Sequence, residues 1–180
     1  MGERVPPQPH PSRITDFAGH PLVVSVMQDQ SSVVALTAVN LARAIKAPAL
    51  YFAHVDTSRY ADQEYPDGTV RHVPIDPDLD DEAWPGREAA LTRLVAEWMQ
   101  GQDLPWHFRY LAGRADRALT HLARAVDAAG FVVGAHVGHH HRIADFVNGS
   151  LSMQLPHRQH RPVIVVPVRV VDWQGRAPWE

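Results

Sequence analysis

Short apolar runs recur along the chain, separated by segments with a different pattern. The first is PLVVSVM, in which an apolar and β-branched stretch extends from Leu22 to Met27. A short run of this kind is typical of a strand that is buried on both faces, as in a parallel sheet. Three later segments have the same character: ALYFAHV (49–55), FVVGA (131–135) and VIVVPV (163–168). A further strand is predicted at WHFRYLA (106–112), where apolar and polar residues alternate.

Helical periodicity appears between these runs. A helix is predicted over 33–46, and Ser31 or Ser32 can cap its first turn. Its inward face holds Val34, Ala38, Leu41 and Ile45. Two further helical segments are expected to end at Gly101 and Gly130, because glycine tolerates the left-handed conformation that closes a helix. The order strand, helix, strand requires crossover connections, which are nearly always right-handed, so the sheet is predicted to be mainly parallel.

The predicted fold class is α/β: a flavodoxin-like, doubly wound, five-stranded and mainly parallel sheet with helices on both faces. In open sheets of this type, ligands bind beyond the carboxyl ends of the strands, at the point where the strand order reverses. The loops after the first and fourth predicted strands are therefore the expected site.

Three segments fall outside the strand and helix pattern. Residues 1–20 contain four prolines and are predicted to form a flexible arm, ahead of an α/β domain over 21–170. Residues 56–85 are rich in proline and acidic side chains, and we expect an insertion or lid loop with a short strand at 70–75. Residues 171–180 are predicted to be a C-terminal tail.

Composition narrows the classes of function. The chain has 180 residues, 45% of them hydrophobic, a formal charge of −3 and no cysteine. There is no overall positive field to attract nucleic acid or an acidic membrane, and neither is an expected partner. The absence of cysteine excludes disulfides, thiolate metal ligands and thiol catalysis. No signal peptide or membrane-spanning stretch is visible, so we expect a cytoplasmic protein.

The loop after the fourth predicted strand has the pattern of a phosphate site. It reads GAHVGHHHRIADFVNGS, with glycines at 134, 138 and 149 and with Ser150 opening a helix. Glycines let the backbone approach an anion closely, and the free N–H groups at a helix start favour negative charge. Glycine-rich turns after parallel strands are also common as simple tight connections, so this pattern alone leaves both interpretations open.

The same stretch resembles the universal stress protein family, whose loop at this point reads G-x2-G-x9-G-S/T before a short helix and a final strand. The section VNGSLSMQLPHRQHRPVIVVPV matches from Gly149 onward, and the SxxAL opening at Ser32 and the FVVGA strand agree as well. The resemblance covers most of residues 21–168. It implies a flavodoxin-like domain that acts in stress tolerance, is a homodimer through its last strand and, in one branch of the family, binds ATP or AMP.

The resemblance also implies site residues, and it shows a degenerate ATP-binding motif. The family's aspartate at the end of the first strand aligns with Met27, and Asp29 lies two residues later. Val55 corresponds to the valine beside adenine. The loop has the spacing G-x3-G-x10-G-S, two residues longer than in the family. The implied binding residues are Asp29, Val55, Gly134, Gly138, Gly149 and Ser150.

Four histidines stand in this loop where small residues usually surround phosphates: His136, His139, His140 and His141. With Arg142 they can neutralise phosphate when partly protonated, since their ordinary pKa is about 6.5. They can equally ligate Zn or Ni, with Asp145 as a further ligand. A solvated polar loop without a specific ligand is the third interpretation.

Three function hypotheses from different classes follow, and the last of them is a metal-binding protein that uses the His136–His141 cluster. The first is a stress-response binding or regulatory module with weak or absent adenine-nucleotide binding, and not an enzyme. The second is a nucleotide-phosphate hydrolase or transferase that uses a loop histidine as general acid or base. No carboxylate pair or nucleophile triad in the sequence supports the second hypothesis.

Overall fold

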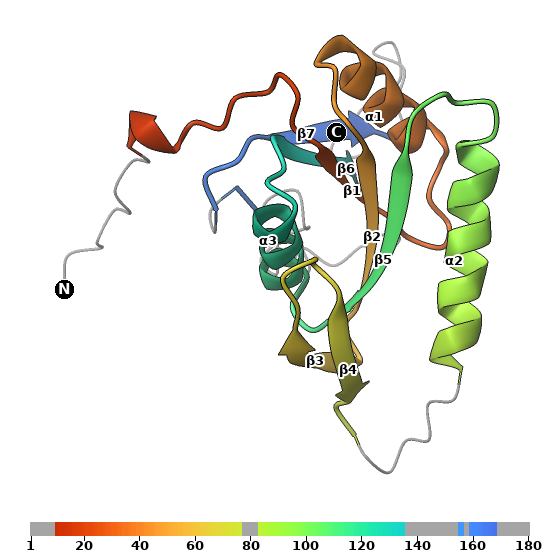
Figure 1. The fold of residues 1–180 in the computed structure, drawn as a ribbon. Helices are drawn as coiled ribbons and strands as arrows, with labels where there is room; N and C mark the ends of the chain where they lie inside the picture. Colours follow the sequence, from red (N-terminus) through yellow and green to blue (C-terminus); the bar gives the residue numbers. More distant parts are fainter. Residues whose placement is uncertain (1–9, 77–82, 136–154, 157–158, 169–180) are drawn as a thin grey trace, which may run out of the picture.

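Five parallel strands form the central sheet (Figure 1). The structure is a computed structural model, and it describes residues 10–76, 83–135, 155–156 and 159–168. The strands are β1 (Leu22–Ser25), β2 (Leu50–Asp56), β5 (Trp106–Ala112), β6 (Gly130–Ala135) and β7 (Val163–Pro167). Their order is β5-β2-β1-β6-β7, and every neighbouring pair is parallel. The predicted fold class is confirmed.

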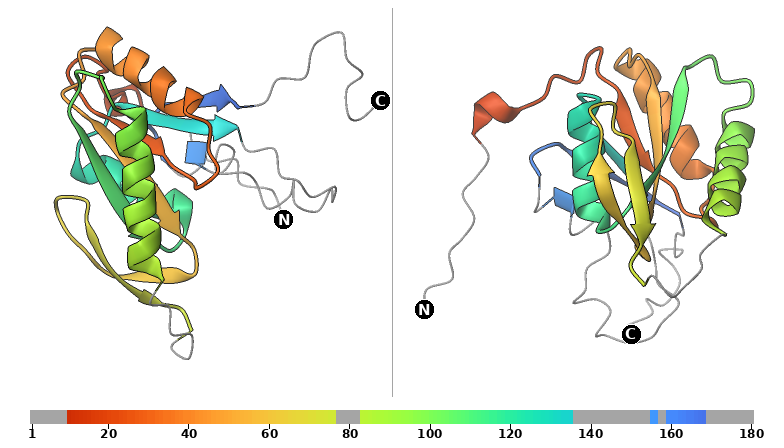
Figure 2. Two further views of the ribbon diagram at one scale, coloured as in Figure 1. Left: turned by 90° about the vertical axis from the view of Figure 1, so that its right-hand side faces the viewer. Right: turned by 60° about the horizontal axis from the view of Figure 1, so that its bottom comes forward.

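Helices cover both faces of the sheet (Figures 1 and 2). α1 (Val33–Ala44) and α2 (Trp84–Trp98) pack on one face, and α3 (Ala115–Ala125) packs on the other. Alternate residues of each strand therefore enter two separate cores, since successive side chains of a strand point to opposite faces. In β1, Val24 belongs to the core under α1 and α2, and Val23 to the core under α3.

An antiparallel hairpin occupies most of the expected insertion. It consists of β3 (Arg59–Glu64) and β4 (Val70–Pro74), and its turn packs against α3 at Gly68. The short strand expected at 70–75 is confirmed as β4. Its partner β3 was not predicted, because it reads RYADQE, has one buried residue and lacks apolar alternation. Residues 77–82 of the insertion lie outside the described part of the chain.

The ends of the helices depend on local backbone contacts that the sequence pattern did not fully predict. α2 begins at Trp84, several residues before Leu91, the first buried residue of its apolar face. Pro85 fits in the first turn because the N–H groups there have no partner within the helix, so the N–H that proline lacks is not needed. Gly130 was expected to close α3, which is wrong, since it is the first residue of β6. Asp127 closes α3 instead with a φ of 50°, and the N–H of Ala128 donates to the carbonyl of Ala123. At α1, the Oγ of Ser31 accepts from the N–H of Val33.

The segment before β1 contacts the domain. A single 3-10 turn, η1 (Pro11–Arg13), is followed by Phe17, whose ring packs against the core under α1. The N–H of Gly19 donates to the carbonyl of Ile45, and Nδ1 of His20 lies 3.3 Å from the carboxylate of Asp127. Residues 1–9 and the expected tail at 171–180 lie outside the described residues.

Candidate functional site

The strand order reverses between β1 and β6. The chain moves from β1 outward to β2 and β5, and then returns to β6 on the other side of β1. At such a reversal the two connections leave on opposite faces of the sheet, which opens a crevice at the carboxyl ends of the strands. The carboxyl ends of β1 and β6, which are the first and fourth predicted strands, therefore lie side by side at this edge. The loop after β6 lies outside the described residues, so its part in a site stays a prediction.

The turn after β1 presents Met27 and Asp29 to solvent. The N–H of Met27 donates to Oε1 of Gln30 over 2.8 Å, and this bond fixes which end of the Gln30 amide is oxygen. The Nε2 of Gln30 is shielded from solvent and has no hydrogen-bond partner. The end of β1 thus carries a methionine and an amide, and Asp29 is an exposed turn residue.

The end of β2 is tied to its neighbours. Val55 pairs with Leu111 of β5, and its side chain packs against the core under α3. His54 points to the other face, where its Nδ1 lies 2.9 Å from the carbonyl oxygen of Val26. Val55 therefore contributes to the core with its side chain, and His54 links the ends of β1 and β2.

Gly134 is the part of the expected phosphate loop that the structure describes. A Cβ at this position would lie 3.2 Å from Val34, 3.3 Å from Val168 and 3.5 Å from Nε2 of Gln30. A side chain at this position would therefore be tightly packed, and glycine lets β6 lie close to α1 without that crowding. The other predicted loop residues lie outside the described part of the chain. They are Gly138, Gly149, Ser150, His136, His139, His140 and His141.

A buried ion pair lies beside this edge, at the ends of β2 and β5. Asp56 is 8% exposed, and its Oδ2 accepts from the Tyr110 hydroxyl at 2.6 Å and from Arg87 at 2.9 Å. Its Oδ1 accepts from the N–H and the hydroxyl of Ser58. Burial alone would raise the pKa of this carboxyl, but the hydrogen bonds outweigh burial and hold the pKa well below its ordinary value. Burial and the bond to Asp56 raise the pKa of Tyr110 to about 12.

Aromatic rings connect this ion pair to the hairpin. The ring of His72 in β4 lies edge-on to Trp84 of α2 at 4.6 Å between centroids, and Trp84 lies 5.9 Å from Tyr110. Nε of the buried Arg59 donates to Nδ1 of His72 at 2.7 Å, and its guanidinium lies 5.5 Å from the Trp84 ring centre. A carboxylate bonded this fully and shielded from water is an anchor for the hairpin and α2, and it is not poised for proton transfer.

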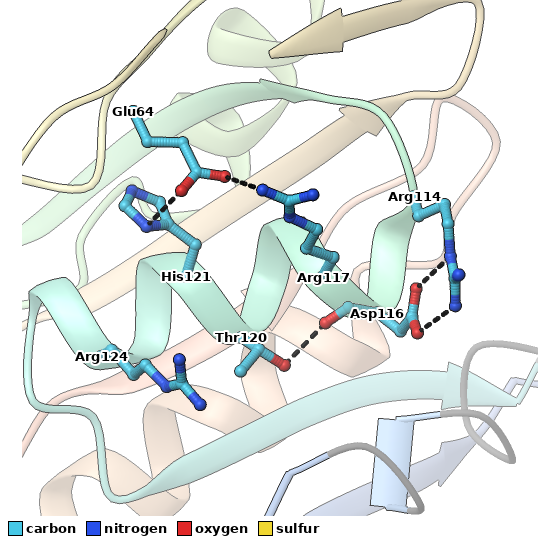
Figure 3. Close-up of a pocket in the computed structure, with 7 residues that line it drawn as sticks. All are labelled: Glu64, Arg114, Asp116, Arg117, Thr120, His121 and Arg124. Atoms are coloured by element: carbon cyan, nitrogen blue, oxygen red, sulfur yellow. Dashed lines mark hydrogen bonds and ion pairs between the residues drawn. The ribbon is translucent and has the colours of Figure 1, made fainter. Parts of the chain in front are cut away.

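A polar hollow of about 380 Å³ opens on the outer side of α3 (Figure 3). Its walls come from α3 and from Glu64 at the end of β3. Glu64 reaches toward two side chains of the helix: its carboxylate lies 3.3 Å from Nδ1 of His121 and 3.7 Å from Arg117. The residues around the hollow are Glu64, Arg114, Asp116, Arg117, Thr120, His121 and Arg124.

Neither the ion pair nor the hollow was predicted from the sequence, although the sequence carries a signal for each. Asp56 is an acidic residue directly after a buried strand, which is a common place for functional or anchoring carboxylates. Arg114, Arg117, His121 and Arg124 are spaced i, i+3, i+7 and i+10, which predicts one cationic helix face. Arg87 and Tyr110, which bind Asp56, lie 31 and 54 residues from it along the chain and could not be inferred. Glu64, which contacts Arg117 and His121, is also distant in the sequence.

Two further observations concern ligands and membranes. Among the described residues, no group of three or more histidine, aspartate or glutamate side chains is arranged to hold a metal ion. The four loop histidines predicted for Zn or Ni lie outside those residues, so their role stays a prediction. No helix in the part of the chain that the structure describes is both long and apolar enough to span a membrane.

Comparisons with known proteins identify the fold. No protein-family model and no curated protein sequence matches the chain. Solved structures do match. A universal stress protein in complex with cAMP is 22% identical, covers 84% of this chain and 99% of its own, and superposes with a TM-score of 0.57. A universal stress protein from Archaeoglobus fulgidus in complex with dAMP is 19% identical over 81% of this chain and 96% of its own, with a TM-score of 0.54.

A third structure extends this similarity to another organism. Universal stress protein UspA from Lactobacillus plantarum is 15% identical over 84% of this chain and 99% of its own, with a TM-score of 0.51. The chain is thus an open α/β protein in which the strand order reverses between β1 and β6. Within that class it has the fold of the universal stress proteins, and the resemblance seen in the sequence is confirmed at the level of fold.

Proposed function

We propose that this chain is a universal stress protein that acts as a stress-response binding module, not as an enzyme, and that it binds adenine nucleotide weakly at the edge between β1 and β6. The observation that carries the proposal is the reversal of strand order between β1 and β6 in a fold whose similar structures hold cAMP and dAMP. Gly134 at the end of β6 keeps backbone close to this edge.

Weak binding follows from the end of β1. The resemblance places a carboxylate at Met27, and the thioether of the exposed Met27 is only a weak hydrogen-bond acceptor for an adenine amino group. Asp29 lies two residues farther along an exposed turn. A site with phosphate contacts but without this base contact has a Kd of about 0.1–1 mM, equivalent to about −5.5 to −4 kcal/mol.

Met27→Asp is expected to tighten AMP and ATP binding about tenfold, because it restores an acceptor for the base. Met27 is 49% exposed, so the substitution costs little stability. Isothermal titration of each nucleotide, with and without magnesium, measures the effect. Gln28→Asp is the matched control, because it places the same charge on an exposed neighbour in the same turn. Equal affinities for the two variants, or nanomolar binding by the natural chain, would contradict the proposal.

We also propose a homodimer through β7. β7 is an edge strand of the sheet, and Val165 in it is 45% exposed. An apolar edge strand invites pairing with a second chain, because its outer N–H and C=O groups have no partner within the sheet. A two-fold axis beside β7 would extend the sheet across both copies.

Sedimentation equilibrium is expected to give twice the chain mass of 20.1 kDa for the natural protein, and Val165→Lys is expected to shift it to the monomer. A lysine on an edge strand opposes pairing by its charge. Leu36→Lys is the control, since Leu36 is an equally apolar residue on α1 and is 41% exposed. A monomeric natural chain, or an equal shift in both variants, would refute the dimer.

A further inference from the structure

Three arginines and one histidine lie along one face of α3. Their spacing of i, i+3, i+7 and i+10 brings them within an arc of one helix face, about 15 Å from first to last. Figure 3 shows them around the hollow, with Arg117 and His121 directed at Glu64. The row consists of Arg114, Arg117, His121 and Arg124.

Helix stability explains Arg124, a cation in the last turn of α3, but it does not explain Arg114 and Arg117. The amino-terminal end of a helix carries a partial positive charge, so cations there are unfavourable and anions favourable. Arg114 is the N-cap residue of α3 and makes no side-chain capping bond, and Arg117 lies in the first turn. The chain as a whole has a formal charge of −3, so a concentration of arginines on one helix also runs against its average composition.

The cations of the hollow are only partly neutralised. Asp116 binds Arg114 through both carboxylate oxygens, at 2.8 and 3.3 Å. Glu64 is shared between Arg117 at 3.7 Å and His121 at 3.3 Å, so its contact with Arg117 is loose. Within the described ranges Arg124 has no ion-pair partner, and Nε2 of His121 is shielded and without a hydrogen bond. Three guanidinium groups therefore face two carboxylates.

The lining of the hollow indicates the class of ligand. All seven side chains that surround it are charged or polar, so it offers no apolar pocket in which a peptide anchor can be buried. A volume of about 380 Å³ suits a small molecule. Guanidinium groups bind phosphate through paired hydrogen bonds, and a row about 15 Å long suits more than one phosphate group.

We propose that the hollow between α3 and Glu64 binds a small molecule that carries at least two phosphate groups, at a site separate from the edge between β1 and β6. Arg117 and Arg124 bind the phosphate oxygens, with Arg117 leaving its loose contact with Glu64. Asp116 keeps Arg114 in place at the entrance. The site is built from α3 and β3, whereas the nucleotide edge is built from β1 and β6.

Inorganic pyrophosphate is the probe, titrated calorimetrically into the full chain at low salt. Arg117→Ala and Arg124→Ala are each expected to weaken binding about tenfold to a hundredfold, since a charge-assisted hydrogen bond is lost. Both side chains are exposed, so folding tolerates the changes. Arg93→Ala is the control, because Arg93 is an exposed arginine of α2 away from the hollow, and it is expected to leave the affinity unchanged.

The proposal is overturned if titration with pyrophosphate to about 10 mM gives no heat of binding. It is also overturned if Arg93→Ala weakens binding as much as Arg117→Ala and Arg124→Ala do, or if AMP and pyrophosphate compete for one site. Competition would mean that the phosphate belongs to the nucleotide at the β1–β6 edge. Pyrophosphate binding that depends on Arg117 and Arg124 while AMP fails to bind would support the hollow and refute the proposed nucleotide function, so the two proposals fail independently.

Discussion

Asp56→Ala is expected to lower the free energy of unfolding by about 2–4 kcal/mol, because it leaves the buried Tyr110 hydroxyl and the partly buried Arg87 without their acceptor. Arg87 at 2.9 Å and the Tyr110 hydroxyl at 2.6 Å both lose their acceptor, and Ser58 loses two bonds. Urea unfolding followed by circular dichroism measures the change. Loss of this anchor also releases the contacts that hold the hairpin and α2 at the end of β5.

The control for this prediction is Asp62→Ala. Asp62 lies in β3 and forms an ion pair with Arg71 across the hairpin, but both side chains are exposed. Surface pairs contribute about 0–1 kcal/mol, so this variant is expected to remain close to the natural stability. Equal losses for the two variants would show that the Asp56 network does not anchor the fold.

The Asp56 network also predicts a dependence on pH. Because the folded-state pKa of Asp56 lies below its ordinary value of 3.8, its stabilisation is fully present above about pH 4 and is lost as the pH falls through the folded pKa. The stability difference between the natural chain and Asp56→Ala is therefore expected to be constant from pH 5 to 8 and to shrink in stronger acid. A difference that grows in acid would contradict this assignment.

Gly68→Ala is expected to cost about 2–4 kcal/mol, from backbone strain and from overpacking together. Gly68 forms the turn of the hairpin with a φ of 81°, and a Cβ there would lie 2.5 Å from Cδ1 of Leu122 and 3.5 Å from Ala125. Leu122 is fully buried, so its side chain cannot move aside cheaply. The thermal midpoint and urea unfolding both report the loss.

Gly101→Ala separates the two contributions to that loss. Gly101 has a φ of 74° but open space around its Cα, so an added Cβ meets no neighbour within 4 Å. This variant carries the backbone strain alone and is expected to lose about 1–2 kcal/mol. If both glycine variants lose the same amount, the hairpin turn does not pack against α3 as described.

The sequence predicted best the elements whose local pattern reports burial. The strands that begin at Leu22 and Val163 were predicted at their first residue, because apolar β-branched runs are typical of strands in a parallel sheet. The strand at 106–112 was predicted to the residue from its alternation of apolar and polar positions. β3 was missed because its side chains are mostly exposed, and it is a strand only by virtue of its pairing with β4.

The candidate sites were predicted less well, for a related reason. Asp56 is bound to groups 31 and 54 residues away along the chain, and Glu64 meets Arg117 only because the hairpin lies beside α3. The periodicity of apolar and polar residues reports which face of one element is buried, and it does not report which distant residues contact each other. Conversely, Gly134 fitted a phosphate-loop pattern, and the structure gives it a packing role against Val34 and Val168 that the pattern did not indicate.

By itself the sequence determined the α/β class, the alternation of buried strands and amphipathic helices, and the resemblance to the universal stress proteins. These features can be predicted from local periodicity and short motifs, because the apolar and polar residues of a strand or helix follow the burial or exposure of its faces. Only the tertiary structure decided the strand order β5-β2-β1-β6-β7, the docking of the hairpin on α3, the Asp56 anchor and the cationic hollow. Each of these joins residues that are distant in the chain, and their proximity depends on the closure of the whole fold.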